Sequence, residues 1–114
     1  MQRKIDDPSL FFVRSKMGKK KVRSVNLRGK VYKLTKSGSI SKDTRGYCTD
    51  IGQPNKRICL DSKLNGEEEL EVWIHEFLHA CFWDMDETAI EETAADISHA
   101  LWRLGYRKSK NPKD

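Results

Sequence analysis

Residues 67 to 82 carry a hydrophobic repeat that constrains the fold of this 114-residue chain more than any other stretch. An amphipathic helix gathers apolar residues three and four positions apart on one face, which must be buried against other elements. The spacing is met here by Leu70, Ile74, Phe77, Leu78 and Cys81. The sequence therefore predicts a helix over 67–82 that packs along this stripe.

The flank of that stripe carries the pentapeptide His75-Glu76-Phe77-Leu78-His79. Residues four apart stack on one helix face, so the two imidazoles can reach the same ion. In an H-E-x-x-H helix the two histidines bind zinc and the glutamate acts on a metal-bound water. We predict a Zn2+ site with His75 and His79 as metal ligands and Glu76 as the catalytic residue.

A catalytic zinc site usually has three protein ligands, so a third must come from outside the pentapeptide. A second helix is predicted over about 87–104, with an aspartate before it as N-cap and Gly105 as its C-cap. Its apolar phase places Glu91 and Glu87 at the border of the buried face. Glu91 is the preferred third ligand, because Glu87 lies in the first turn, where an ordinary capping role explains it.

Glu92 is an alternative third ligand. Glu92 and Asp96 form an E-x-x-x-D pair similar to that of thermolysin-type enzymes, in which Asp96 would support the metal ligand. The helical phase argues against this pair, since it directs Glu92 toward solvent.

The two helices and their acidic residues resemble a minimal gluzincin-type zincin, similar to the ImmA/IrrE-type peptidases and to small metallopeptidase-like proteins of phages and bacteria. Glu91-x-x-Ala94 follows the spacing of the ligand glutamate in that family, whereas Ala95 replaces its usual asparagine. The resemblance implies a zinc-dependent metallopeptidase that hydrolyses peptide bonds of a protein substrate. Glu76 would then serve as general base and proton donor.

Short segments rich in strand-forming residues precede the first helix, at 46–51 and 57–60, and residues 22–34 predict a hairpin with its turn at 28–30. The expected fold class is α+β, a small zincin-like domain with a three- or four-stranded sheet followed by two helices. Zincins of this shape hold an extended substrate along a sheet edge, which suggests a groove wall formed by Arg57, Ile58, Cys59 and Leu60. Candidates for an oxyanion donor are Tyr47, His99 and Tyr106.

Charge divides the chain at about residue 45. Residues 1–45 carry 14 Lys and Arg against 3 Asp and Glu, a net +11, while the remainder carries 8 against 14, a net −6. The basic segment, partly hairpin and partly flexible, could contact nucleic acid or an acidic partner, or could be a solubilising arm. Its apolar stretch Leu10–Val13 suits a strand or a docking segment. Residues 46–106 form the expected metal-binding core of this single domain, and 107–114 a polar tail.

The three cysteines contain no C-x-x-C pair, which argues against a disulfide framework and a zinc ribbon. Buried free thiols are expected, with Cys48 or Cys59 as possible neighbours of the metal. The sequence has no apolar run of about 18 residues and no hydrophobic region after its first basic residues, so we expect neither a membrane span nor a secretory signal. The cytoplasm of a bacterial cell or phage-infected host is the expected compartment.

Two other functions are compatible with these patterns. One is a DNA-associated metalloprotein similar to the SprT-like proteases, in which the basic segment supplies affinity for nucleic acid. The other is a non-catalytic interaction module that keeps zinc for its stability.

Overall fold

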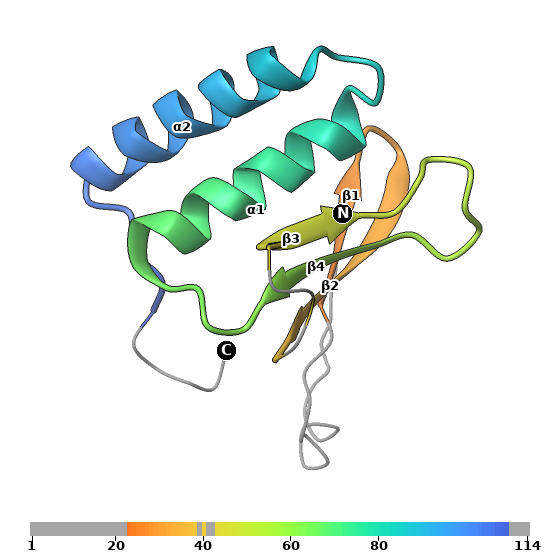
Figure 1. Cartoon of the computed structure of the whole chain (residues 1–114), viewed down its shortest axis with the longest axis horizontal. Helices are drawn as coiled ribbons and strands as arrows, with labels where there is room; N and C mark the ends of the chain where they lie inside the picture. Colours follow the sequence, from red (N-terminus) through yellow and green to blue (C-terminus); the bar gives the residue numbers. More distant parts are fainter. Residues whose placement is uncertain (1–22, 39, 41–42, 110–114) are drawn as a thin grey trace.

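The structure, a computed structural model, describes residues 23–38, 40 and 43–109 of the chain. The element order is β1 (Arg23–Leu27), β2 (Lys30–Ser37), β3 (Gly46–Cys48), β4 (Arg57–Asp61), α1 (Gly66–Cys81) and α2 (Glu87–Arg103), shown in Figure 1. A four-stranded sheet followed by two helices confirms the predicted α+β fold. The predicted strand or docking segment Leu10–Val13 lies outside the described residues.

Strands β1 and β2 form the predicted antiparallel hairpin. Its two turn residues, Arg28 and Gly29, have φ angles of 50° and 83°. In a two-residue hairpin loop, positive φ at both central positions gives a turn whose twist matches that of the flanking strands. Glycine adopts a positive φ without steric cost. The predicted turn at 28–30 is therefore confirmed to within one residue.

The strand order in the sheet is β1-β2-β4-β3. β4 pairs in parallel with β2 on one side and antiparallel with β3 on the other. It therefore lies inside the sheet, and the edge next to it is β3. The strands at 23–37, which belong to the basic segment of the sequence, share this sheet with those at 46–61.

The helices form two further layers above one face of the sheet (Figure 1). α1 lies on the strands, and α2 packs on α1 without touching a strand. Tyr32, Ile58 and Leu60 of the sheet form the core together with Val72 and Ala80 of α1. The predicted helices at 67–82 and 87–104 match the observed bounds to one residue. Neither described helix is long and apolar enough to cross a lipid bilayer.

Gly46 allows α1 to approach the edge strand closely. A Cβ atom at this position would lie 2.9 Å from Cγ1 of Val72 and 3.2 Å from the carbonyl oxygen of Cys59. Both distances are shorter than ordinary van der Waals contact, so any side chain would push the helix away. This glycine therefore sets the spacing between β3 and the helix that carries the histidines.

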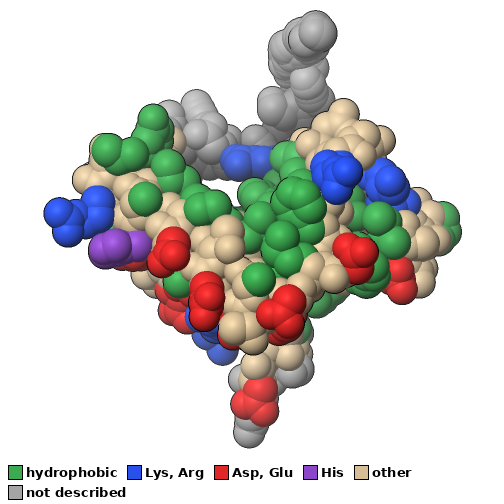
Figure 2. Space-filling view, turned by 90° about the horizontal axis from the view of Figure 1, so that it is seen from above, with side chains coloured by type: hydrophobic (Ala, Val, Ile, Leu, Met, Phe, Trp, Pro, Cys, Tyr) green, Lys and Arg blue, Asp and Glu red, His purple; other side chains and the backbone are tan. Residues whose placement is uncertain are grey.

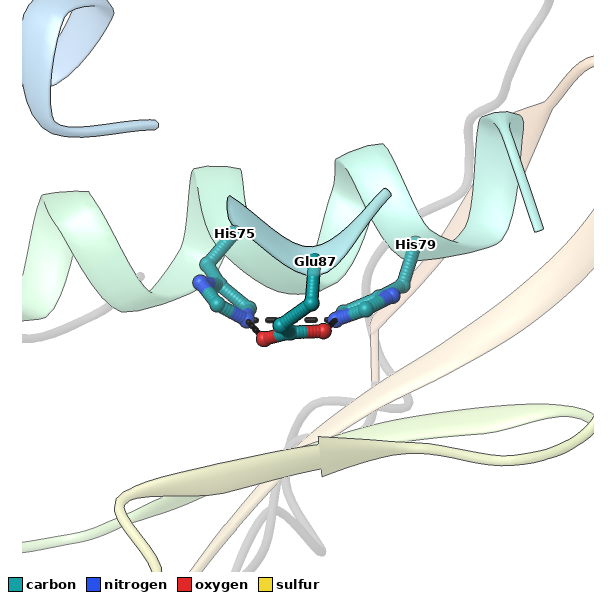
Figure 3. Close-up of side chains that lie close together, drawn as sticks. All are labelled: His75, His79 and Glu87. Carbon is teal, nitrogen blue, oxygen red and sulfur yellow. Dashed lines mark hydrogen bonds and ion pairs between the residues drawn. The ribbon is translucent and has the colours of Figure 1, made fainter. Parts of the chain in front are cut away.

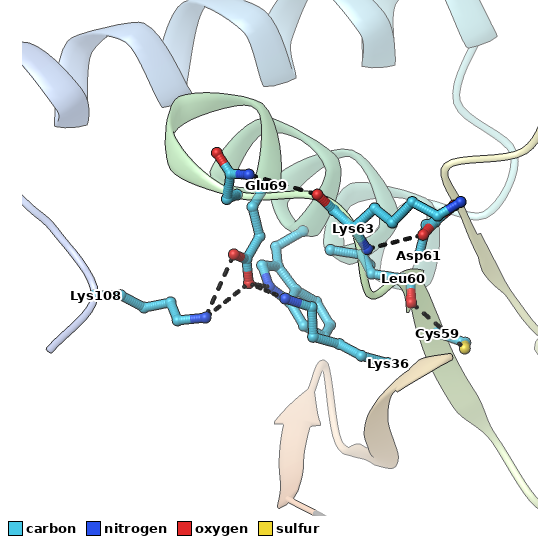
Figure 4. Close-up of polar contacts among 9 residues, drawn as sticks. Lys36, Cys59, Leu60, Asp61, Lys63, Glu69 and Lys108 are labelled. Atoms are coloured by element: carbon cyan, nitrogen blue, oxygen red, sulfur yellow. Dashed lines mark hydrogen bonds and ion pairs between the residues drawn. The ribbon is translucent and has the colours of Figure 1, made fainter. Parts of the chain in front are cut away.

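A buried carboxylate, that of Glu69, fixes the start of α1 (Figure 4). Lys36 of β2 donates to it at 3.0 Å, Trp73 at 3.1 Å, and Lys108 after α2 lies 3.3 Å away. Burial raises the pKa of this carboxyl, but the hydrogen bonds from Lys36 and Trp73 outweigh burial and lower it below its ordinary value. One side chain thus connects the sheet, the first helix and the segment after the second.

Candidate metal centre

Three side chains that can bind a metal converge beside α1: those of His75, His79 and Glu87. The two histidines lie one turn apart on α1, and Glu87 is the first residue of α2. The Nε2 atoms of the histidines are 3.2 Å apart. Oε2 of Glu87 lies 3.3 Å from Nε2 of His75, and Oε1 lies 3.1 Å from Nε2 of His79. Figure 3 shows the three side chains pointing to one place.

These separations suit a tetrahedral zinc ion. Zinc binds imidazole nitrogen at about 2.0–2.1 Å and carboxylate oxygen at about 2.0–2.2 Å, which separates two tetrahedral ligand atoms by about 3.4 Å. The two Nε2 atoms are 3.2 Å apart, and each lies near a different oxygen of Glu87, at 3.3 Å for His75 and 3.1 Å for His79. His75, His79 and Glu87 could therefore hold a zinc ion with three protein ligands, the number usual in catalytic zinc sites.

Burial favours the form of His79 that binds metal. The side chains of His75 and His79 are 19% and 23% exposed. Burial lowers the pKa of His79, and the neighbouring His75 lowers it further, although the Glu87 carboxylate opposes both effects. A neutral imidazole has the free lone pair that coordination needs.

Glu87, and neither Glu91 nor Glu92, stands beside the histidines. Glu91 and Glu92 are exposed and lie outside the group. The preference for Glu91 assumed that Glu87 was occupied in capping the helix. The N-cap is Asp86, in agreement with the predicted aspartate, because its side chain accepts a hydrogen bond from the amide of Ala89 at 3.1 Å. Glu87 is therefore free to turn toward α1.

The helical phase of α2 agrees with this placement. The buried residues are Ile90, Ala94 and Ser98, whereas the apolar Ile97 is 40% exposed. At about 100° per residue, Glu87 lies about 20° from the centre of the buried row and Glu91 about 60°. The short connection after α1 brings this first turn of α2 level with the histidines. The short loop between the two helices and the aspartate N-cap are therefore the sequence features that point to Glu87 as the residue beside the histidines.

Other residues predicted for the site lie elsewhere. Asp96 is exposed and nine residues beyond Glu87, about 13 Å along the helix, too far to support this ligand. His99 pairs with Glu67 at 3.0 Å near the opposite end of α1. Tyr106 follows the C-terminus of α2 and is 63% exposed. The structure brings none of these three to the histidines.

Glu76 is 7% exposed and has no hydrogen-bond partner among the described residues. Burial, reinforced by the charge of Glu87, raises its pKa to about 7. Its charge in turn helps to raise the pKa of Cys48 on β3, although burial is the larger cause. The Glu76 carboxyl is therefore close enough to Glu87 and to Cys48 to interact with their charges, and no described side chain forms a hydrogen bond with it.

The predicted groove wall of Arg57, Ile58, Cys59 and Leu60 is wrong, because these residues form most of β4, which has a partner strand on each side. Ile58, Cys59 and Leu60 are also buried. The accessible edge beside α1 is β3. Hydrogen bonds from Thr49 to Arg57 and from Asp61 to Arg45 show which residues of this strand face β4. By alternation, the amide and carbonyl groups of Gly46 and Cys48 face outward.

Neither of the cysteines considered near the metal belongs to the group of possible ligands. Cys48 points to the α1 side of the sheet, where burial raises its pKa to about 12, so that it stays a thiol. Tyr47, its neighbour on β3, faces the opposite side of the sheet. It therefore does not reach the histidines as an oxyanion donor.

Comparison with protein-family models, with curated proteins and with solved structures gave no match for this chain. The chemistry of the three ligand residues and Glu76 is therefore the basis for assigning a function.

Proposed function

We propose that this protein is a zinc-dependent metallopeptidase that hydrolyses peptide bonds in a protein substrate. The observation that carries the proposal is the grouping of His75, His79 and Glu87 close to the buried carboxyl of Glu76, which has no hydrogen-bond partner among the described residues. A metal kept only for stability is usually enclosed by four protein ligands, whereas this group offers three. Glu87, with 57% of its side chain exposed, keeps the site open to solvent.

The metal would supply Lewis acidity, polarising the scissile carbonyl and making water a nucleophile at neutral pH. The protein's own contribution to proton transfer is Glu76. It takes a proton as water attacks the carbonyl carbon and delivers that proton to the amide nitrogen as the C–N bond breaks. Water and one peptide bond thus become one carboxyl group and one amine.

The substrate would bind as an extended segment along β3. The outward amide and carbonyl groups of Gly46 and Cys48 can pair with a peptide backbone, as in other complexes in which a peptide adds a strand to a sheet edge. Such pairing uses main-chain groups alone, so a range of sequences would be accepted. The edge also lies next to Glu76, which places the paired backbone near the proton acceptor.

The decisive experiment compares the zinc-loaded wild type with Glu76→Gln, which keeps the size of the side chain and removes its basicity. Metal content is measured on both purified proteins, and hydrolysis is followed with fluorescently labelled unfolded casein. We expect both proteins to hold one zinc, and the variant to lose at least about 100-fold in rate, since general acid–base catalysis contributes about 10²–10⁴-fold.

His75→Ala is the matched control for metal binding and should lose the ion. A wild type that binds zinc without cleaving any peptide would contradict the peptidase and favour a zinc-stabilised interaction module. A wild type that binds no zinc would contradict both.

A further inference from the structure

The face of the sheet that turns away from α1 is not covered by any described element (Figure 1). Alternate residues of β2 point to opposite faces. Tyr32 is buried in the core and Lys36 reaches Glu69 of α1, so both point to the helix side. Val31 and Lys33 therefore point to the open face. β2 and β4 are parallel, and Arg57 of β4 is paired with Lys33, so the side chains of both residues point to this open face.

Two cations are thus adjacent on this face, and no acidic side chain in the described part of the chain pairs with them. Lys33 and Arg57 are both exposed, and neither has a carboxylate partner among the described residues. Like charges on directly paired strand positions destabilise a sheet. Other cations near the sheet are matched, since Lys36 pairs with Glu69 and Arg45 with Glu68, each at 3.0 Å. The unmatched pair is therefore a suitable place for an anionic ligand.

An aromatic ring lies next to the cations. Tyr47 of β3 pairs with Cys59, two residues along β4 from Arg57 and on the same face. Its side chain is 39% exposed, and that of Val31 is 60% exposed. A diagonal neighbour across two strands is about 7–8 Å away, within reach of long side chains. The acid on this face, Asp61, lies two positions further and accepts a hydrogen bond from the amide of Lys63.

Charge is distributed unequally between the two sides of the molecule. Figure 2, viewed from the helix side, shows Asp and Glu side chains along α2, where Glu91, Glu92 and Asp96 are exposed. The described residues up to position 45, which include β1 and β2, carry six Lys and Arg against one Asp. An anion that approaches the molecule would be repelled by α2 and attracted to the open face.

We propose that the open face of the sheet binds single-stranded nucleic acid, with phosphates on Lys33 and Arg57 and a base stacked on Tyr47. Surfaces that hold single strands without sequence preference combine a basic track with aromatic rings in this way. An acidic peptide would use the two cations but would gain nothing from the exposed ring. The face is separate from the metal centre, which lies on the other side of the sheet.

The test uses the full chain and fluorescein-labelled oligo(dT) of 20 nucleotides, with binding followed by anisotropy between 0.05 and 1 M salt. The double variant Lys33→Gln/Arg57→Gln is compared with Lys63→Gln/Arg103→Gln, which removes two exposed cations elsewhere. Each phosphate contact on a single strand contributes a slope of about 0.7 in log affinity against log salt, so two contacts contribute about 25-fold at 0.1 M salt. We expect this loss in the first variant and less than about threefold in the control.

Tyr47→Leu tests the stacking contact and should weaken oligo(dT) binding by at least about fivefold at every salt concentration, because stacking is not an ionic interaction. Thermal unfolding of each variant checks that the sheet is intact. Equal losses in the two double variants would overturn the proposal, as would tighter binding of a duplex or of polyglutamate than of oligo(dT). The measurement needs no zinc, so its failure would leave the proposed peptidase unaffected.

Discussion

Replacing Glu87 by Gln tests the assignment of the third ligand. The substitution keeps the size of the side chain and removes the charge that lies 3.1 and 3.3 Å from the two imidazoles. Glu91→Gln is the matched control, because it makes the same chemical change one turn further along α2 at an exposed position. Both variants retain the Asp86 cap, so the start of the helix should be unchanged.

The expected loss follows from the number of ligands. Zinc sites with four protein ligands bind with about 10–16 kcal/mol, or about 3 kcal/mol for each ligand. Loss of one ligand should therefore raise the zinc Kd by about 100-fold, since about 1.4 kcal/mol corresponds to a factor of ten. At a free zinc concentration 100 times the wild-type Kd, the stabilisation by zinc should fall from about 2.7 to about 0.4 kcal/mol.

Competition with a chromophoric chelator at neutral pH measures the affinity, and urea unfolding at fixed free zinc measures the stabilisation. Glu91→Gln should match the wild type in both. Loss of zinc from Glu91→Gln together with retention of zinc by Glu87→Gln would refute the assignment, because the ligand would then come from a position outside the histidine group.

Three further substitutions test features that position the site. Glu69→Gln should cost about 2 kcal/mol of stability at pH 7, because the buried charge accepts several hydrogen bonds. The pKa of Glu69 is lower in the folded protein, so this contribution to stability is complete above the unfolded pKa of about 4.3 and is lost as the pH falls through the folded pKa. The urea midpoints of the wild type and of Glu69→Gln should therefore converge in acid. A difference between the midpoints that does not change with pH would contradict the assignment. Gly46→Ala should lower the free energy of unfolding in urea by about 1–3 kcal/mol, and it should raise the KM for peptides by displacing β3. Unchanged stability would contradict the close approach of α1 to β3 at this glycine. Tyr32→Phe removes a buried hydroxyl without a hydrogen-bond partner among the described residues, so it should leave the urea midpoint unchanged or raise it, and a loss above about 1 kcal/mol would reveal a partner.

The elements of the fold could be predicted from the sequence because each has a local cause. The hairpin follows from strand-forming residues on both sides of Arg28-Gly29, and both helices follow from apolar residues at helical spacing. His75 and His79 are four residues apart, so a single helix brings their rings together. These features depend on neighbours in the sequence alone.

The order of the strands could not be predicted, because it depends on contacts between distant segments. β2 and β4 pair in parallel although β3 comes between them in the sequence, and nothing in Arg57–Asp61 distinguishes an inner strand from an edge. Glu87 was not the preferred third ligand for a different reason. Helical phase alone allowed Glu87 as well as Glu91, but the position of Glu87 in the first turn of α2 was attributed to capping, although an aspartate N-cap was also predicted.

All three ligand residues lie between positions 75 and 87, on either side of one short turn. A metal ion bound there closes a very small loop, and the stabilisation gained by closing a loop in the unfolded chain is smaller for a shorter loop. The ion therefore crosslinks two helices that the chain already holds together, while the strands stay outside the loop. We expect the sheet and both helices to persist after the ion is removed by a chelator, so that zinc supply can turn activity off and on without unfolding the protein.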